Sequence, residues 1–193
     1  MNDTNKLTAE EFATQKDELP DGGRWVELVE GQIITYQPPD VLHGNVVMNL
    51  SKQLADSLQT AADAGYACFE LGLIVARDPD TVRMPQVSYY QHGERFAETD
   101  AVVTQVRPTL VVEIASTNDR RREMTSRVQE YLRWGVECVW VIDPVDRQCF
   151  VHRAGRPTEK LPAHETLTGE PFLTDFQIRI DDLFTEPKWW HGK

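Results

Sequence analysis

Two apolar runs on either side of a helical segment constrain the fold more than any other feature. Residues 108–116, PTLVVEIAS, and residues 137–144, ECVWVIDP, are rich in β-branched side chains, as strands buried on both faces of a sheet are. Between them, residues 119–135 predict a helix that ends at Gly135. A strand, a helix and a second strand in this order form a right-handed crossover with parallel strands. We therefore expect a parallel pair at the centre of a sheet.

Local patterns add further elements on the N-terminal side of this unit. Thr8 and Glu11 form a capping-box pattern, which predicts a helix over residues 9–16. Two strand-like runs, residues 24–29 and 32–37, joined by a Glu-Gly pair, predict a hairpin. Apolar residues at three- and four-residue spacing predict an amphipathic helix over residues 41–64.

The remaining patterns complete a sheet. Strands are expected at residues 66–76, 82–90 and 148–154, followed by short strands toward the C-terminus. The fold class is therefore α/β, with a mixed sheet and helices on its faces. A chain of 193 residues is long enough to form one domain over residues 1–193.

Composition narrows the function classes. Cys68, Cys138 and Cys149 are odd in number and lack metal-binding spacing, so we expect buried, reduced thiols and a cytoplasmic protein. Neither a secretion signal nor an apolar run of about 20 residues is found, so a membrane location is not expected. The formal net charge of −11 opposes long-range attraction to a phosphate backbone. Hydrolase and nucleotide-binding motifs such as GxSxG, HExxH and GxxxxGK[ST] are absent from the sequence.

Glu113 stands out within the run VVEIAS. A carboxylate buried there is costly unless it is paired, protonated or bound to a cation. A purely structural interpretation places Glu113 at the rim of the sheet, where it accepts hydrogen bonds from the following helix.

The order of several motifs indicates a functional alternative. Pro85-Gln86, the VEIAS strand, the arginine-rich helix with Tyr131, and VWVIDP, together with WVELVEGQIITYQPP and His43, resemble the Uma-type restriction endonucleases of the PD-(D/E)XK nuclease superfamily. The resemblance is strongest over residues 25–151. It implies a restriction-endonuclease-like mixed central sheet flanked by helices. It also implies hydrolysis of DNA phosphodiesters with Mg²⁺ or Mn²⁺, which prefer oxygen ligands.

The resemblance assigns four site residues. The glutamate of the VEI strand is Glu113, and a further glutamate of the family is matched by Glu27. The aspartate expected directly after the strand proline is Gln86, so Glu113 and Gln86 would be the metal ligands. The lysine expected one helical turn before Tyr131 is Arg127.

Two of these positions are altered. Gln86 removes a negative charge from the implied metal site, which predicts weakened or lost activity. Arg127 keeps its proton, so it could stabilise a transition state but could not act as a base. As an alternative, a neighbouring loop could supply the missing carboxylate from Asp78, Asp80 or Glu94.

Three hypotheses follow for the function. The chain is a Mg²⁺-dependent endonuclease, or a nuclease-fold protein that has lost catalysis and binds nucleic acid, or a protein-interaction subunit, which its acidity would suit. The run 120–122, three arginines, could contact phosphate or form a solvated face. Trp189 and Trp190 suggest a homodimer contact.

Overall fold

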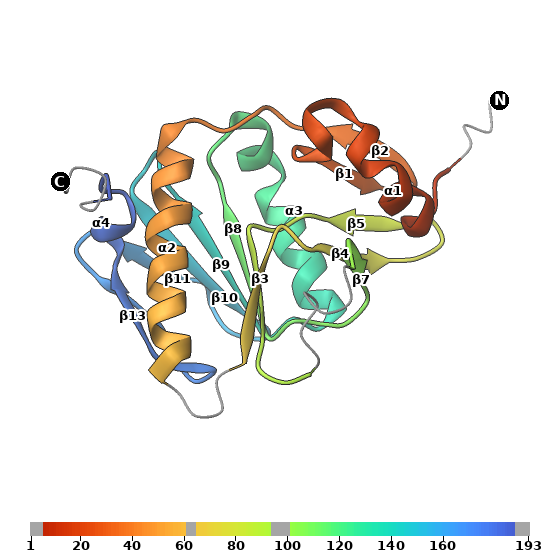
Figure 1. Ribbon diagram of the computed structural model, residues 1–193. Coiled ribbons are helices and arrows are strands. Elements are labelled where there is room, and N and C mark those ends of the chain that lie inside the picture. The colour runs from red at the N-terminus through yellow and green to blue at the C-terminus, as the bar shows by residue number, and fades with distance from the viewer. Residues whose placement is uncertain (1–5, 61–64, 94–100, 188–193) are drawn as a thin grey trace.

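A six-stranded mixed sheet forms the larger part of the molecule, and a five-stranded sheet adjoins it (Figure 1). The computed structural model describes residues 6–60, 65–93 and 101–187. The larger sheet has the order β11-β10-β9-β8-β6-β3. Its strands are β3 (Tyr66–Phe69), β6 (Val87–Tyr90), β8 (Leu110–Ile114), β9 (Cys138–Asp143), β10 (Gln148–Arg153) and β11 (Glu159–Pro162).

The smaller sheet has the order β2-β1-β5-β4-β7. Its strands are β1 (Val26–Val29), β2 (Gln32–Thr35), β4 (Gly72–Ala76), β5 (Thr81–Arg83) and β7 (Val103–Thr104). A third pair is formed by β12 (Thr166–Gly169) and β13 (Leu173–Arg179). The helices are α1 (Ala9–Gln15), α2 (Val41–Thr60), α3 (Asn118–Trp134) and α4 (Ile180–Leu183), with short 3-10 turns η1 (Lys16–Glu18) and η2 (Pro20–Gly23).

The expected parallel pair is confirmed at the centre of the larger sheet. Strands β8 and β9 run parallel, with Val112 opposite Trp140. The connecting helix α3 ends at Gly135, whose φ of 101° lies in the left-handed region that glycine adopts readily. Strand β10 then returns antiparallel to β9, as the sequence predicts.

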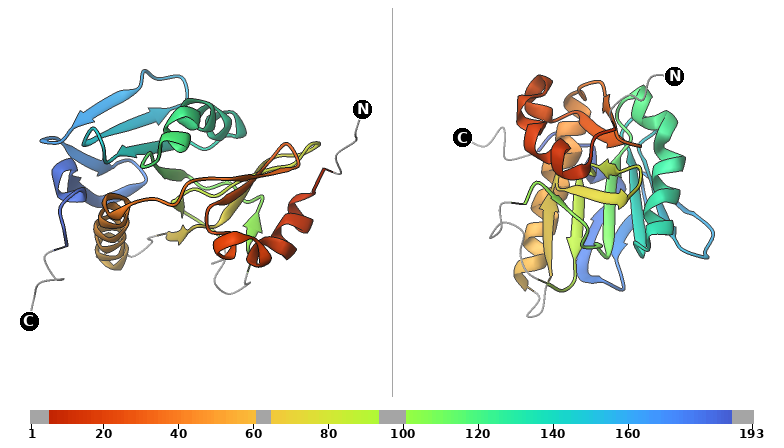
Figure 2. Two further views of the ribbon diagram at one scale, coloured as in Figure 1. Left: turned by 90° about the horizontal axis from the view of Figure 1, so that it is seen from above. Right: turned by 90° about the vertical axis from the view of Figure 1, so that its right-hand side faces the viewer.

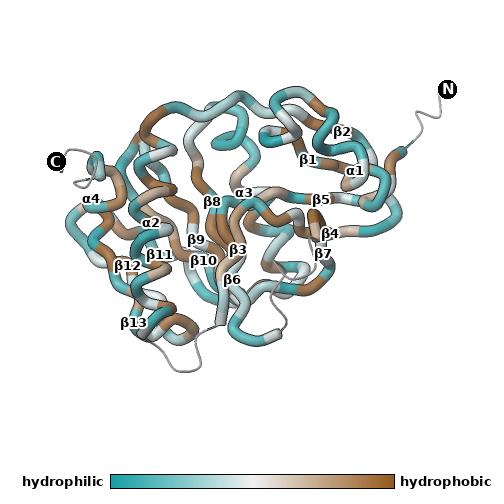
Figure 3. The backbone as a smooth tube through the Cα atoms, viewed as in Figure 1, coloured by the Kyte–Doolittle hydropathy of each residue, from teal (hydrophilic) through white to brown (hydrophobic). Residues whose placement is uncertain are grey.

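The two faces of this sheet are covered by different helices (Figure 2, left). Along β8, side chains alternate between the faces: Val112 belongs to the core cluster that includes Leu50 of α2. Val111 belongs to the cluster that includes Val128 and Tyr131 of α3. Hydrophobic residues accordingly gather along the central strands (Figure 3).

The N-terminal expectations are also confirmed. The Thr8 hydroxyl accepts from Glu11 N at 3.2 Å, and the Glu11 carboxylate accepts from Thr8 N at 2.9 Å, so both halves of the capping box form. The hairpin pairs β1 with β2, and both residues of its Glu-Gly turn have positive φ. None of the described helices is both long and apolar enough to cross a membrane.

The sequence interpretation was wrong about two strands in the middle of the chain, which it predicted to be continuous. Each of the expected strands 66–76 and 82–90 is divided into two, and its halves join different sheets. One break follows Glu70, which has a φ of 52°. The other contains Pro85, which has no N–H for a ladder. The mixed sheet therefore adjoins a second sheet, and Gln86 lies at a bend instead of within a strand.

The three cysteines are free thiols, and Cys138 and Cys149 are buried. Burial raises the pKa of Cys138 to about 11 and raises that of Cys149 further. Because the thiolate is the reactive form, we expect Ellman's reagent at pH 8 to modify half-buried Cys68 well before the other two in the folded protein. Equal reaction rates for all three thiols, with unfolding excluded by circular dichroism, would contradict this prediction.

Candidate functional site

Three of the four predicted site residues meet where the two sheets adjoin. Glu27 comes from β1 of the smaller sheet, Glu113 from β8 of the larger sheet, and Arg127 from α3. All three side chains are fully buried. Glu113 faces α3 because it alternates along β8 with Val112, which faces α2.

The Arg127 guanidinium lies between the two carboxylates. Its Nη1 and Nη2 donate to Glu27 Oε2 and Oε1 at 2.5 and 2.7 Å, a bidentate pair. Its Nε and Nη2 donate to Glu113 Oε1 at 3.1 and 2.7 Å. A single buried arginine therefore joins a residue of each sheet.

Both carboxylates accept further hydrogen bonds. Glu27 Oε1 accepts from Met84 N at 2.9 Å, and Glu27 Oε2 accepts from Arg83 Nη1 at 3.1 Å. Together with the two bonds from Arg127, Glu27 therefore accepts four hydrogen bonds. A carboxylate has about four lone-pair sites, so Glu27 is saturated. Glu113 Oε1 also accepts from the Tyr131 hydroxyl at 2.7 Å.

Two more arginines extend the cluster. Arg83 pairs with Glu130 through Nε at 2.8 Å and Nη2 at 2.9 Å. Arg120 Nη1 lies 3.6 Å from Glu113 Oε2, and its guanidinium stacks 5.0 Å from the centre of the Tyr36 ring. We refer to Glu27, Glu113, Arg83, Arg120 and Arg127 as the arginine-carboxylate cluster.

These charges fix the protonation states at the centre of the cluster. Burial alone would raise the pKa of Glu27, but the charges of Arg127, Arg120 and Arg83 outweigh it and hold that pKa well below its usual range. Burial likewise opposes the charge on Arg127, yet Glu113 and Glu27 raise its pKa well above the usual value. Glu27 is thus a carboxylate and Arg127 a guanidinium throughout the neutral range.

Gln86, the fourth predicted residue, is bonded elsewhere. Its Oε1 lies 2.9 Å from His43 Nε2, and His43 Nδ1 lies 2.9 Å from the Ser116 hydroxyl. Burial and the Arg120 charge lower the pKa of His43, and they outweigh the opposing effect of the hydrogen bond that His43 donates to Gln86. A neutral His43 that donates from Nε2 to Gln86 and accepts at Nδ1 from Ser116 satisfies both contacts. The amide oxygen of Gln86 is therefore already bound.

The residues present do not fit a divalent cation. Mg²⁺ takes about six oxygen ligands in near-octahedral geometry. Within the described residues, Glu113 Oε2 is the one oxygen of Glu27, Glu113 and the Gln86 amide without a hydrogen bond, and the Arg120 guanidinium faces it. Ranges 6–60, 65–93 and 101–187 also contain no group of three or more histidine, cysteine, aspartate or glutamate residues placed to hold a metal ion.

Of the loop carboxylates considered as substitutes, Asp80 already has other partners. Asp80 Oδ2 accepts from Ala9 N at 2.8 Å, at the start of α1, and from Arg77 Nη1 at 2.7 Å. Asp78 occupies the adjoining turn with a φ of 55°. Glu94 lies outside the described residues, as do Trp189 and Trp190.

The three consecutive arginines of α3 have separate roles. Arg120 belongs to the arginine-carboxylate cluster, whereas Arg121 pairs with Asp143 and Asp146 at 2.6 and 2.9 Å. Arg122 Nε donates to its own helix at Asn118 O, at 3.1 Å. The run is therefore neither a uniform solvated face nor a uniform phosphate-binding surface.

Sequence reasoning did not assign Arg83, Arg120 or His43 to one site. A local signal existed for Arg83, because a charged residue within the strand TVR needs a partner if its neighbours are buried. The partners themselves are distant in sequence: Arg83 binds Glu130, and His43 binds Ser116. Such pairings depend on how the two sheets and α3 pack together, which local patterns do not specify.

Comparisons with known proteins agree with this architecture. The model of the Uma2 family, described as "putative restriction endonuclease", matches residues 9–181. The crystal structure of a putative nuclease of the DUF820 family from Anabaena variabilis superposes with a TM-score of 0.72 at 23% sequence identity. The match covers 92% of this chain and 97% of that one, which shows a shared fold. No curated protein matches the chain.

Proposed function

Because the chain belongs to the Uma2 family of putative restriction endonucleases, we propose that it is a restriction-endonuclease-like protein that acts on DNA, with phosphodiester hydrolysis weakened or lost. The family generally uses divalent metals, so Mg²⁺ or Mn²⁺ would be the cation of an active member. In this proposal Glu113 and Gln86 stand at the family's metal-ligand positions, and Glu27 and Arg127 at the neighbouring catalytic positions.

One observation supports the loss of activity above all others. The fully buried Arg127 guanidinium holds Glu27 and Glu113 together through four hydrogen bonds. These carboxylates would have to release the guanidinium before they could bind a cation. The positive charges of Arg83, Arg120 and Arg127 would also repel a divalent ion.

Gln86 supports the proposal independently. Its amide carries no charge, and its oxygen is bound to His43. Compared with aspartate, it would contribute less to the affinity for Mg²⁺, which rises with the number of charged ligands.

The experiment restores both altered positions together. We expect the native protein to leave supercoiled plasmid intact with Mg²⁺ or Mn²⁺, and the double variant Gln86→Asp/Arg127→Lys to nick it. In the double variant a compact ammonium replaces the planar guanidinium and a carboxylate returns to the ligand position. Adding Glu113→Ala to the double variant should abolish nicking, which excludes a contaminating nuclease.

Two outcomes would count against the proposal. Cleavage by the native protein that Glu113→Ala abolishes would show that the site is active as it stands. Calorimetric titration with Mn²⁺ provides a second reading: the double variant should bind Mn²⁺ and the native protein should not. If neither protein binds Mn²⁺ nor cuts, the assignment of Gln86 and Arg127 as the disabling residues is wrong.

A second candidate function follows from the net charge of −11. A nuclease-fold protein without hydrolysis could work as a nucleic-acid-binding module or, given this acidity, as a protein-interaction module. Salt-dependent binding of DNA without cleavage would favour the former, and lack of binding at low salt would favour the latter.

We expect a single domain over residues 1–193 and a cytoplasmic protein. Because aromatic residues are enriched at protein interfaces, the adjacent Trp189 and Trp190 in the sequence suggest a homodimer.

A further inference from the structure

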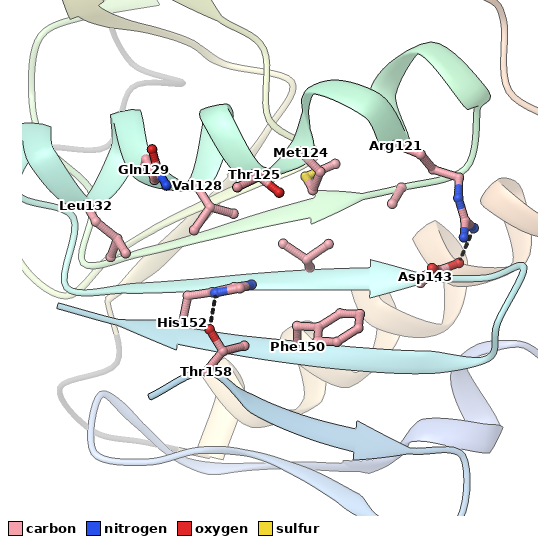
Figure 4. A pocket seen from close by; sticks show the side chains of 12 residues that line it. Arg121, Met124, Thr125, Val128, Gln129, Leu132, Asp143, Phe150, His152 and Thr158 are labelled. Carbon is pink, nitrogen blue, oxygen red and sulfur yellow. Dashed lines mark hydrogen bonds and ion pairs between the residues drawn. The ribbon is translucent and has the colours of Figure 1, made fainter. Parts of the chain in front are cut away.

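A cavity of about 460 Å³ is lined by residues of α3 other than those in the arginine-carboxylate cluster. One wall is formed by Met124 and Val128 of α3, and the other by Val141 of β9 with Phe150 and His152 of β10. Figure 4 shows the helix side chains and those of β10 on opposite sides of this gap. Its volume falls within the range of small-molecule sites, about 300–1,000 Å³.

The pattern of α3 explains why the cavity and the cluster are separate. Met124, Val128 and Leu132 recur every four residues and line the cavity. Arg127 and Tyr131 recur at the same spacing on another stripe of the helix and bind Glu113. The two sites therefore use different side chains of one helix.

Two aromatic rings line one wall of the cavity. The rings of Phe150 and His152 lie 6.3 Å apart between their centres, with planes inclined by 29°. They project from one face of β10 because they are two residues apart. A planar ring can stack on such a surface, with the aliphatic side chains of α3 on its other side.

The polar groups around the cavity indicate a neutral ligand. Arg121, at one end, is paired with Asp143 and Asp146 at 2.6 and 2.9 Å. His152 Nδ1 is bound to the Thr158 hydroxyl at 3.0 Å, and burial lowers the pKa of His152, so the ring is neutral at pH 7. No unpaired charge is therefore offered to a ligand by these groups.

Hydrogen-bonding groups remain beside the aromatic surface. Thr125 and Gln129 line the cavity from exposed positions of α3. The Thr125 hydroxyl can donate and accept, and the other ring nitrogen of His152 adds a further group. The Gln129 amide oxygen accepts from Arg133 Nη2 at 3.3 Å, so its amide nitrogen remains to donate. This set matches the edge of a planar heterocycle that carries both donors and acceptors.

We propose that this cavity binds a single nucleobase, stacked between Phe150 and the α3 side chains and hydrogen-bonded through Thr125 and Gln129. The choice of a nucleobase among neutral heteroaromatic rings rests on the proposed function, in which the chain acts on DNA. The other parts of the proposal, a neutral planar ring that stacks and forms hydrogen bonds, rest on the cavity alone. Single-stranded nucleic acids and free nucleosides share this chemistry, since stacking on aromatic side chains tolerates every base.

The test uses 2-aminopurine, whose fluorescence falls when it stacks. The probes are 2-aminopurine riboside and a single-stranded DNA oligonucleotide with 2-aminopurine at one position. We expect saturable quenching of both probes by the native protein. Thr125→Trp should fill the mouth of the cavity and weaken binding of both probes by about tenfold or more, because a built-in clash opposes the ligand.

Ser126→Trp is the matched control. Ser126 is an exposed neighbour on the same helix and does not line the cavity, so this variant should bind like the native protein. Urea unfolding of both variants checks that neither substitution disturbs the fold. If Thr125→Trp proves destabilised, a Gln129→Trp variant of the same design replaces it.

Each other outcome overturns the proposal. Absence of saturable quenching with both probes would exclude a base site, and equal effects of the two tryptophan variants would place binding elsewhere. Oligonucleotide binding without quenching would show backbone recognition, which rejects the base pocket but leaves the proposed function standing. The riboside has no phosphodiester, so its result is independent of any cleavage.

Discussion

Replacing Arg127 with methionine is expected to lower the free energy of unfolding by about 3–5 kcal/mol, the usual cost of breaking a buried ion pair. Methionine fills a similar length but leaves Glu27 and Glu113 as two fully buried carboxylates without their shared partner. Urea unfolding at pH 7, followed by circular dichroism, measures the change. We expect a lower midpoint with little change in slope.

Two further variants separate charge from packing. Arg121→Met removes a partly exposed guanidinium from the same helix, which pairs with Asp143 and Asp146. It should cost much less, because partly exposed ion pairs contribute little. Adding Glu27→Gln and Glu113→Gln to Arg127→Met should recover part of the loss, since the two buried carboxylates are then neutral and only Arg120 loses its ion-pair partner. A triple variant as unstable as Arg127→Met would indicate that packing, not charge, dominates.

Replacing Glu27 with glutamine is the second change with a large expected effect. Glu27 accepts hydrogen bonds from Arg127, Arg83 and the Met84 backbone. Its loss leaves the Arg127 and Arg120 guanidinium groups with Glu113 as their one shared buried carboxylate, while Arg83 keeps its pair with Glu130. A loss of about 3–5 kcal/mol is again expected at pH 7.

The pH dependence of stability distinguishes this effect from a simple packing loss. The folded-state pKa of Glu27 lies far below its ordinary value of 4.5. Below pH 4.5 the unfolded chain therefore binds a proton that the folded protein does not, so stability falls as the pH decreases. Urea midpoints measured from pH 7 to pH 3 should fall less steeply for Glu27→Gln than for the native protein.

Glu10→Gln is the matched control for this series. Glu10 also has a lowered pKa through its hydrogen bonds with Arg77, but its side chain is exposed. The Glu10→Gln variant should show almost the same decrease of the urea midpoint with falling pH as the native protein. Parallel native and Glu27→Gln profiles below pH 5 would contradict the assignment of Glu27 as a buried carboxylate.

The sequence predicts the local architecture around the site well. The strand-helix-strand unit of β8, α3 and β9 is confirmed. It could be predicted because each element has a strong local pattern: β-branched apolar runs for the strands and a helix that ends at a glycine. The resemblance to a nuclease family also selected Glu27, Glu113 and Arg127, which the fold brings into contact. Their roles in chemistry stay a prediction.

Other features could not be predicted because they depend on the packing of distant segments. The run 82–90 was predicted as one strand, but a run of residues suited to strands has the same local pattern whether it pairs within one sheet or is divided between two. The placement of Gln86 beside His43 follows from that break. Likewise, the sequence does not distinguish Arg120 from the two arginines that follow it. Its separate role becomes clear only in the folded structure, where Arg120 lies beside Tyr36 and Glu113.

The cross-sheet position of Arg127 has a consequence for how the molecule could accommodate a duplex. Glu27 and Glu113 belong to different sheets, and one buried guanidinium binds both. A hinge motion that moved one sheet away from the other would have to break the ion pairs of Arg127 with Glu27 and Glu113. These side chains are buried, so water would not be there to solvate the separated charges. Such an opening is therefore costly, so under the proposed function a nucleic acid would have to change its own shape to fit the existing surface.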